Sequence, residues 1–411
     1  MTNSLFKTLK KASQNDFAFT IDEDNPYEVK EWIDTGCYAL NAVLSDGDIF
    51  KGIPNGKRIM ISGESGVAKS LFIAIMVKAY LDQVENSVCI FFESEASTVI
   101  DMATSIGIPE DKILIVPVQT VEEFRTQCDR MLDKIIDINS AIEKKNSAEK
   151  NPEKHKPLHK PIFVLDSLGN LGTLAESEII ATDKRSKGKQ TRDMTRAALI
   201  RGMARTISLK IAMAQIPLLM TNHTYKVMSE YTPDETSGGG GIKYMSDISL
   251  ILTKAKEKDA GKKQVGIIIT IQTRKSRYMK ENKTVKVLIS FTRGMYRYSD
   301  IVNKAAELGV IKKDGISYTF PPEHDKDKKV KMKDVRMHAS KYFTGDLLDN
   351  VRAAIKSDFG FGIEDGKFDF FDDMEENFDD RSDEEMEDDV DKLLEEFDES
   401  KTESSDKTVI K

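Results

Sequence analysis

The chain alternates short apolar runs with stretches of helical periodicity over most of its length. Between residues 34 and 300 this alternation is typical of βα units with a parallel sheet, whose strands are apolar throughout because both faces are covered. Buried strands of this kind are predicted at 58–62, 88–92, 113–118, 161–166 and 216–222. Three closely spaced runs predict an antiparallel or mixed continuation, at 248–253, 265–273 and 284–291. The pattern therefore predicts an α/β fold with a mostly parallel central sheet flanked by helices.

Composition divides the chain into four segments. Residues 1–33 combine a short amphipathic helix, LFKTLKKA, with an extended stretch and then an acidic, turn-rich one. Residues 34–300 form the core, and 301–363 predict a small, charged, mostly helical module. Residues 364–411 contain too few apolar side chains to fold alone, so we expect a disordered acidic tail. The core also contains a Lys-rich insertion, 143–160, which we expect to be a solvated loop.

Charge is strongly segregated along the chain. Residues 364–399 hold 20 acidic and three basic residues, a charge of −17 in a chain whose formal net charge is −8, and the last twelve residues add +1. Residues 1–363 therefore carry +8. A mildly basic body with an acidic tail is typical of a protein that binds a polyanion and carries its own competitor. It is equally typical of a protein with a solubilising, disordered end.

The sequence argues against two broad classes of protein. It contains no apolar run of about 18 residues, the length that spans a membrane. Its first residues lack the apolar core and small-residue cleavage site of a secretory signal. Three cysteines, Cys37, Cys89 and Cys128, stand singly at spacings that suit neither a disulfide framework nor a zinc site. We therefore expect a cytoplasmic protein with reduced thiols.

A glycine-containing turn follows the strand at 58–62 and precedes an apolar helix. Its residues are Gly63, Glu64, Ser65, Gly66, Val67, Ala68, Lys69 and Ser70. Strand, turn, Lys-Ser and helix are the order of a Walker A loop, whose backbone N–H groups bind phosphates at a helix N-terminus. Lys69 would bridge the β- and γ-phosphates, and the Ser70 hydroxyl would ligate Mg²⁺. Ala68 replaces the usual second glycine, which is tolerable if this residue keeps a negative φ.

Acidic residues stand at the ends of two further predicted strands. Asp166 ends the strand at 161–166, where a carboxylate can orient the water shell of Mg²⁺. Glu93 and Glu95 follow the strand at 88–92, and one of them could poise a water against the γ-phosphate. Each acid alone is also an ordinary residue of a turn or a strand end. Together with the loop they predict a site that hydrolyses ATP with Mg²⁺.

These motifs resemble, in order and spacing, those of the RecA recombinase family, most closely the UvsX-type recombinases of tailed bacteriophages. The likeness covers about residues 30–320. It rests on WIDTGCYALNAVLSDGDIFKGIPNGKRIMISGESGVAKS, FFESEAS, LDSLGNL, RDMTRAALIRGMAR, TNHTY, SGGGG, RKSR and RGMYRYSDIVNKAAELGVIKKDGISYTF. It implies a RecA-like P-loop ATPase core with small N-terminal and C-terminal modules. For a viral protein the expected compartment becomes the host cytoplasm.

The resemblance also implies roles for residues around the nucleotide. It assigns activation of the hydrolytic water to Glu95, and Mg²⁺ binding to Asp166 with Ser70. His223 stands at a strand end where the family has a polar sensor of the γ-phosphate, so it would relay the nucleotide state to the loop beyond. Met102 stands where the family often stacks a Tyr on adenine, and its thioether can pad a base.

Further roles that the resemblance implies concern a neighbouring subunit. Lys275 and Arg277 match a basic pair that reaches the neighbour's γ-phosphate and stabilises the transition state, as an arginine finger does. Phe17 and Phe19 fall in a segment that the family inserts into the next subunit by edge pairing.

Two loops are expected to face DNA. The first, about 172–192, holds five closely spaced basic residues, Lys184, Arg185, Lys187, Lys189 and Arg192. The second, about 224–243, holds Tyr225, Lys226 and four consecutive glycines, Gly238, Gly239, Gly240 and Gly241. Basic side chains would contact phosphates with a salt-dependent affinity, and Tyr225, Met228 or Tyr231 would wedge against bases. The insertion at 143–160 is either a spacer or an additional DNA contact.

The resulting interpretation is a DNA-dependent ATPase that uses ATP and Mg²⁺. It would form helical filaments of its own copies on single-stranded DNA and exchange strands with duplex DNA, in recombination, repair and recombination-dependent replication. A single-strand-binding protein and a recombination mediator are the expected partners, without a membrane. Two alternatives are a ring-forming helicase of the same fold and a non-hydrolysing scaffold or mediator. The lack of a long N-terminal helical domain argues against the first, and Lys69, Glu95 and Asp166 together argue against the second.

Overall fold

The computed structural model describes ten stretches of the chain: 4–14, 18–20, 25, 27–95, 103–176, 189–225, 235–236, 245–258, 264–322 and 329–361. Within them, the side chains of 4, 189–195, 225, 235–236 and 258 are not described. Backbone contacts divide the chain into two units, 1–361 and 362–411, and the second lies outside the described residues. Several predicted site residues also lie outside them: Phe17, Met102, Lys184, Arg185, Lys187, Lys226, Met228, Tyr231 and Gly238 to Gly241.

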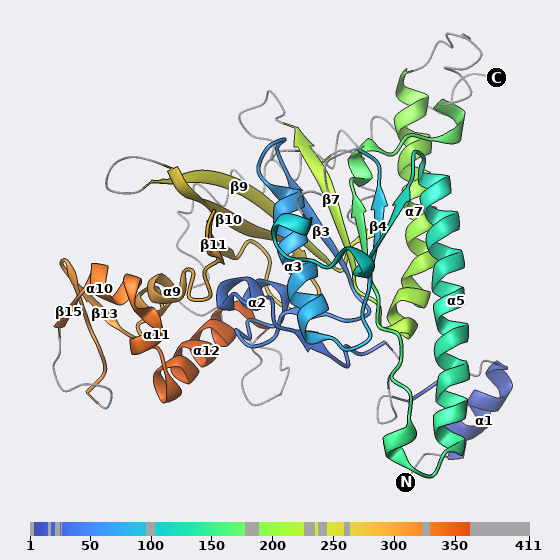
Figure 1. Ribbon diagram of the computed structural model, residues 1–411, viewed down its shortest axis with the longest axis horizontal. Helices are drawn as coiled ribbons and strands as arrows, with labels where there is room; N and C mark the ends of the chain where they lie inside the picture. The colour runs from blue at the N-terminus through green and yellow to red at the C-terminus, as the bar shows by residue number, and fades with distance from the viewer. Residues whose placement is uncertain are drawn as a thin grey trace, which may run out of the picture. The chain divides into compact units, whose positions relative to one another are not determined.

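A large sheet forms the centre of the core (Figure 1). In spatial order its strands are β12 (Gly294–Met295), β11 (Thr284–Ser290), β10 (Gln264–Ser276), β9 (Ile248–Lys258), β3 (Arg58–Gly63), β7 (Leu218–Tyr225), β6 (Ile162–Asp166), β4 (Cys89–Glu93) and β5 (Ile113–Pro117), with β8 (Glu235–Thr236) beside β7. The pairs from β9 through β3, β7, β6 and β4 to β5 are parallel. The pairs from β9 to β12 are antiparallel. All eight predicted strands and the antiparallel continuation are confirmed.

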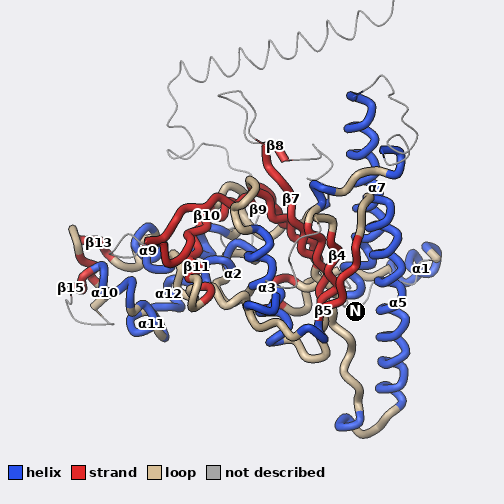
Figure 2. Tube along the Cα trace, turned by 45° about the horizontal axis from the view of Figure 1, so that its top comes forward, coloured by secondary structure: helices blue, strands red, loops and turns tan. Residues whose placement is uncertain are grey.

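Helices cover both faces of this sheet. On one face α5 (Val121–Ala148) and α7 (Lys189–Ala214) lie side by side, and on the other lie α2 (Tyr38–Leu44) and α3 (Lys69–Gln83) (Figures 1 and 2). Successive strand residues point to opposite faces. In β3, accordingly, Met60 packs with the α5 and α7 side, whereas Ile59 and Ile61 pack with the α3 side. The run is apolar throughout because both faces are buried.

The remaining elements of the first 170 residues are short, apart from the first helix. They are α1 (Ser4–Ser13), β1 (Trp32–Ile33), β2 (Ile53–Pro54), and the 3₁₀ turns η1 (Glu110–Lys112), η2 (Pro152–Lys154) and η3 (Leu168–Asn170). Helix α1 confirms the predicted amphipathic helix. No helix of the described stretches is both long and apolar enough to cross a membrane. Cys37, Cys89 and Cys128 are buried and form no disulfide.

The Lys-rich insertion is exposed to solvent, as expected, but it is not a loop throughout. Its first part, 143–148, is the exposed end of α5, and the chain then returns along that helix. Asn146 exchanges two hydrogen bonds with the backbone of Lys156, both 2.9 Å, and Asn139 does the same with His159. The seven helical steps from Asn139 to Asn146 rise about 10.5 Å, close to the roughly 10 Å spanned by three extended residues. This match lets two side chains on one face of α5 hold an extended segment in register.

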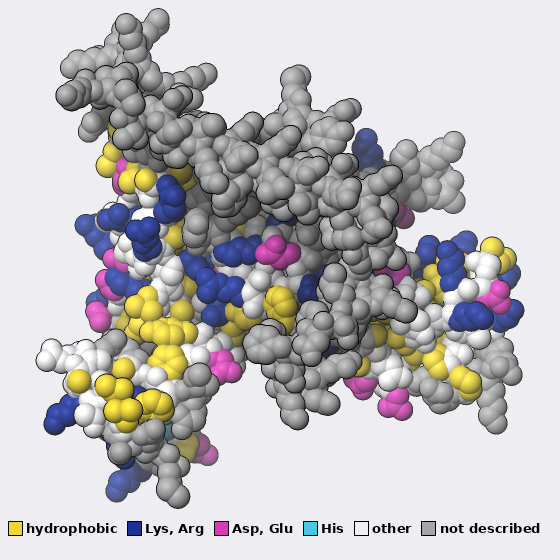
Figure 3. Space-filling model, turned by 180° about the vertical axis from the view of Figure 1, so that it is seen from behind, with side chains coloured by type: hydrophobic (Ala, Val, Ile, Leu, Met, Phe, Trp, Pro, Cys, Tyr) yellow, Lys and Arg dark blue, Asp and Glu magenta, His cyan; other side chains and the backbone are white. Residues whose placement is uncertain are grey.

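Residues 301–361 were expected to be mostly helical, and this prediction omitted a small sheet. The segment contains four helices, α9 (Ile301–Glu307), α10 (Met332–Met337), α11 (Ala339–Tyr342) and α12 (Gly345–Phe359), within its described part. It also contains an antiparallel sheet of β13 (Lys312–Asp314), β14 (Ser317–Thr319) and β15 (Lys329–Lys331). Helix α12 packs against α2, where Arg352 Nε donates to Asp48 Oδ1 at 2.7 Å. Exposed lysines gather around the small sheet (Figure 3, right): Lys312, Lys313, Lys329, Lys331 and Lys333.

Candidate functional site

The predicted phosphate loop connects β3 to α3, as expected. Lys69 is the first residue of α3, and its Nζ donates to the backbone carbonyls of Gly63 and Glu64 at 3.0 and 3.1 Å. Burial lowers the pKa of Lys69, and the charges of Glu95 and Asp166 act in the opposite direction. Gly63 is required, because a Cβ there would lie 2.8 Å from the Leu252 carbonyl oxygen. The loop therefore wraps around its own lysine.

Ala68 does not keep the negative φ that the sequence analysis required of it. Its φ is 73° and its ψ 34°, in the left-handed region, as is Gly66 with a φ of 76°. A left-handed backbone costs an L-residue about 1–2 kcal/mol. The turn thus needs two left-handed residues before α3, and this chain supplies glycine at only one of them. The condition for a tolerable alanine is therefore not met, because the path of the loop fixes φ at this position.

Replacing Ala68 with glycine is expected to change the free energy of unfolding by less than about 1 kcal/mol. Relief of the left-handed strain and the greater freedom of glycine in the unfolded chain are of similar size and opposite sign. The matched control is Ala79→Gly inside α3, where glycine should destabilise by about 1 kcal/mol. Urea unfolding of both variants tests this, and an equal loss in both would contradict it.

Four parallel strands, β3, β7, β6 and β4, bring the other predicted residues to the same end of the sheet. Gly63 pairs in register with His223 across β3 and β7, and Glu93 with Asp166 across β4 and β6. In parallel sheets the crevice beyond the carboxyl ends of the strands is where ligands bind. The phosphate loop, His223, Asp166 and the segment carrying Glu95 all lie at this crevice.

A chain of polar contacts links Lys69 to Glu95. Lys69 Nζ lies 3.3 Å from His223 Nδ1, and His223 Nε2 lies 3.1 Å from Glu95 Oε1. Since an ammonium only donates, Nδ1 accepts, and in the neutral ring Nε2 carries the proton and donates to Glu95. Ser167 Oγ donates to the same Glu95 oxygen at 2.5 Å. Burial raises the pKa of Glu95, but hydrogen bonds from Ser167 and His223 and the charge of Lys69 outweigh it, so the pKa is lowered.

Asp166 has the surroundings of a carboxylate that serves a hydrated cation. It is 2% exposed, and Oδ1 accepts from the Thr221 hydroxyl. Oδ2 is buried and has no hydrogen-bond partner among the described residues. A buried carboxylate oxygen without a donor is rare, and the waters of a bound Mg²⁺ are suitable donors. With the half-buried Ser70 in the first turn of α3, the residues present fit Mg²⁺ with a nucleotide phosphate.

Lys275 and Arg277 lie at the opposite end of the strands. Ser276 pairs with Ile248 on β9, and Ile248 pairs with Ile59 at the start of β3. The two cations are therefore one strand length, roughly 17 Å, from Gly63. Within one copy of the chain, Lys275 and Arg277 therefore lie away from the phosphate loop.

The remaining predicted residues are placed only in part. Lys189 and Arg192 lie in the first turns of α7, and Tyr225 ends β7, but their side chains are not described. The ring of Phe19 packs edge-on against Tyr27 at 5.5 Å between centroids.

Two polar residues of the crevice were not predicted from the sequence. Ser167 follows Asp166 directly, and its place just past a strand end was a usable signal. Lys254 lies on β9 and donates from Nζ to the Gly66 carbonyl. No local pattern marks this lysine, because its contact joins residues 188 positions apart.

Comparison with known proteins places this geometry in context. No protein-family model matches the chain. The recombination and repair protein of Enterobacteria phage T4 is 28% identical over 311 residues, 76% of this chain and 72% of the phage protein. RecA of Syntrophus aciditrophicus is 24% identical over 294 residues, 71% of this chain and 75% of that protein. RecA of Mesomycoplasma hyopneumoniae is 22% identical over 355 residues, 85% and 93% of the two chains.

Proposed function

We propose that the chain is a DNA-dependent ATPase of the RecA recombinase family, because it is similar over most of its length to the recombination and repair protein of phage T4 and to bacterial RecA. In this proposal it assembles with ATP and Mg²⁺ into helical filaments on single-stranded DNA, and there pairs and exchanges homologous strands. The observation that carries the ATPase is the convergence of Lys69, Glu95, Asp166 and His223 at one crevice.

The proposed reaction transfers the terminal phosphoryl group of ATP to water. Glu95 accepts a proton from the attacking water. The water oxygen bonds to the γ-phosphorus while the bond between that phosphorus and the oxygen bridging to the β-phosphate breaks, so ADP leaves. Its lowered pKa keeps the carboxylate ionised and ready to accept. Asp166 and Ser70 would hold Mg²⁺, which when bound neutralises charge on the β- and γ-phosphates. Met102 would contact the base.

Nucleotide binding requires Lys69 to leave its present partners. Its Nζ now contacts two carbonyls of its own loop and His223. Phosphate oxygens would replace these contacts, because a charged acceptor binds an ammonium more strongly than a carbonyl does. His223 Nδ1 would then lose its donor, and once protonated it would donate to an oxygen of the γ-phosphate. Since His223 lies on β7, which leads into the second DNA loop, this exchange is a route by which nucleotide state reaches DNA.

The DNA-binding part of the proposal rests on the two loops. Lys184, Arg185, Lys187, Lys189 and Arg192 would contact phosphates from the first loop. Tyr225, Lys226 and the run Gly238 to Gly241 would order around a single strand from the second. Duplex DNA, a single-strand-binding protein and a mediator are the further proposed partners.

Electron microscopy with ATP and single-stranded DNA tests the assembly. We expect helical filaments, which a strand-exchange protein needs in order to hold a long stretch of DNA in one geometry. Closed rings would favour a helicase, and the absence of any DNA-dependent assembly would favour a non-hydrolysing scaffold.

Removing residues 364–411 is expected to tighten binding to single-stranded DNA by about 3- to 10-fold at low salt, because the −17 stretch competes with phosphates for basic side chains. Fluorescence anisotropy across a salt series measures the effect, which should shrink as salt rises. A full-length control with the tail acids changed to Asn and Gln separates charge from length. Unchanged affinity in both variants would show that the tail does not compete with DNA.

A further inference from the structure

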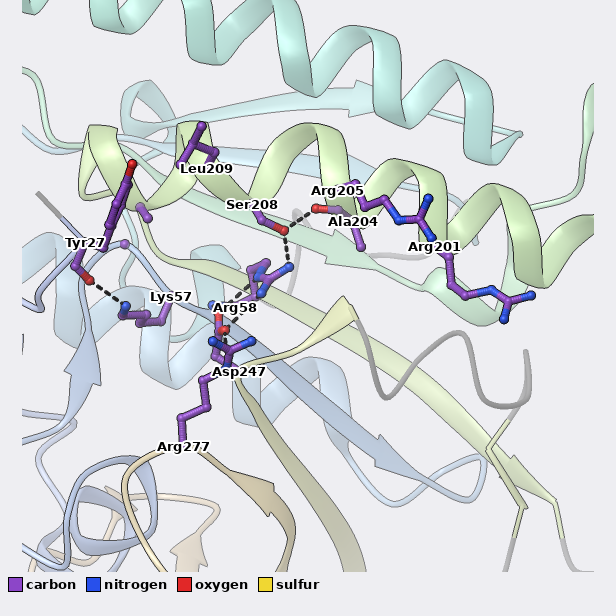
Figure 4. Close-up of a pocket in the computed structure, with 12 residues that line it drawn as sticks. Tyr27, Lys57, Arg58, Arg201, Ala204, Arg205, Ser208, Leu209, Asp247 and Arg277 are labelled. Carbon is purple, nitrogen blue, oxygen red and sulfur yellow. Dashed lines mark hydrogen bonds and ion pairs between the residues drawn. The ribbon is translucent and has the colours of Figure 1, made fainter. Parts of the chain in front are cut away.

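A cleft of about 690 Å³ lies at the amino-terminal end of β3, one strand length from the phosphate loop (Figure 4). Its described lining carries five cations and one carboxylate: Lys57, Arg58, Arg201, Arg205 and Arg277, with Asp247. Burial lowers the pKa of Lys57, and Arg277 and Arg58 add to this, whereas Asp247 opposes it. The excess of positive charge favours an anionic occupant.

Asp247 is bound by two arginines, Arg58 at the start of β3 and Arg277 directly after the end of β10. Arg58 donates three hydrogen bonds, from its backbone N–H and Nε to Oδ2, both 3.0 Å, and from Nη2 to Oδ1 at 2.9 Å. Arg277 Nε lies 3.2 Å from Oδ1. Arg58 therefore fills three of the roughly four lone-pair sites that a carboxylate offers, and Arg277 forms an ion pair at Oδ1. Burial raises the pKa of Asp247, but the bonds and charge of Arg58, and then the charge of Arg277, lower it overall.

The two arginines differ in their exposure and in which guanidinium nitrogens are free of Asp247. Arg58 is 6% exposed and is fixed from the other side by Ser208 on α7. The Arg277 side chain is 61% exposed and meets Asp247 through Nε, so its terminal nitrogens remain at the cleft (Figure 4). Lys275 is held by Ser246, the residue before Asp247, because its Nζ donates to the Ser246 carbonyl at 2.7 Å. Ser246 and Asp247 thus hold Lys275 and Arg277.

We propose that Asp247 is the positioning residue for Arg277. A long arginine side chain must be ordered before it can stabilise developing charge, and an ion pair through Nε orders it beforehand. The anchor is the buried Arg58–Asp247 ion pair, whose two side chains are each 7% exposed. This inference rests on the proposed function, in which Arg277 acts on the triphosphate bound by a neighbouring copy.

A double-mutant cycle on ATP turnover with saturating single-stranded DNA tests the proposal. Arg277→Ala should lower kcat about 100-fold, the order seen when one donor to a transition state is lost. Asp247→Asn should lower kcat about 10-fold. KM for ATP should stay within about 2-fold of the parental value, because ATP is bound at the phosphate loop and not at Asp247. In the Arg277→Ala background, Asp247→Asn should change kcat by less than about 2-fold. The control is Ser208→Ala, which removes a contact of Arg58 without touching Arg277 and should stay within about 2-fold of the parent.

Three results would overturn the positioning role alone. They are parental kcat in Asp247→Asn, a full 10-fold loss in the Arg277→Ala background, and an equal loss in Ser208→Ala. If Asp247→Asn does not fold, the variant Arg277→Lys tests the proposal instead. The single nitrogen of a lysine cannot both pair with Asp247 and reach an anion, so kcat of Arg277→Lys should match kcat of Arg277→Ala. Parental kcat in Arg277→Lys would sink the proposal. Parental kcat in Arg277→Ala, or no DNA-dependent turnover in the parent, would instead contradict the proposed function itself.

Discussion

Glu95→Gln is expected to lower DNA-stimulated ATP turnover by about 10²- to 10⁴-fold, the usual contribution of a general base. The amide keeps the shape of the side chain and its oxygen still accepts from Ser167 and His223, so the crevice should stay intact. What it loses is the ability to take a proton. ATP affinity should therefore change by no more than a few-fold, because Lys69 and the loop backbone make the phosphate contacts.

The matched control is Glu93→Gln, two residues earlier on the same strand end. Glu93 Oε1 accepts from the backbone N–H of Glu95 at 2.6 Å, so it shapes the turn that presents Glu95. We expect a loss of less than about 10-fold there, the scale of one neutralised hydrogen bond. Steady-state turnover and binding of a fluorescent ATP analogue separate the two variants. If Glu93→Gln is the inactive protein and Glu95→Gln turns over normally, the base is Glu93.

The parts of this molecule that were predictable from sequence are those set by local periodicity. The strands 58–62 and 161–166 are apolar because helices cover both faces, and the ends of parallel strands meet at one crevice, so Lys69 and Asp166 were found without a structure. The Ala68 conformation was not predictable, because the path of the loop forces it. The ordered insertion was missed because Asn139 and Asn146 look like ordinary polar helix residues until the returning chain is placed beside them.

Long-range ion pairs escaped the sequence analysis for a different reason. Arg58 and Asp247 are 189 positions apart. Charged residues are ordinary at the start of a strand, so neither one indicates a partner. Only the placement of β9 beside β3 brings them together. The same placement separates Lys275 and Arg277 from the phosphate loop of their own chain, a feature that follows from topology and not from any motif.

Arg58→Met is expected to lower the free energy of unfolding by about 3–5 kcal/mol, because it leaves Asp247 buried without its main partner. That loss is large beside a typical total of about 5–15 kcal/mol. The lowered pKa of Asp247 means that its contribution is fully present above its unfolded pKa of about 3.9 and is lost as the pH falls through the folded value. Urea unfolding near pH 7 therefore measures the whole effect.

The double variant Arg58→Met with Asp247→Leu separates stability from catalysis. Replacing both members of a buried pair with apolar side chains of similar volume is often neutral, so the double variant should recover most of the stability that the single variant loses. It should not recover turnover, because Arg277 then has no carboxylate to hold its Nε. A stable double variant that hydrolyses ATP at the parental rate would show that the buried pair serves folding alone. A double variant as unstable as Arg58→Met would show instead that Arg58 stabilises the core through its own packing against Ser208 and α7.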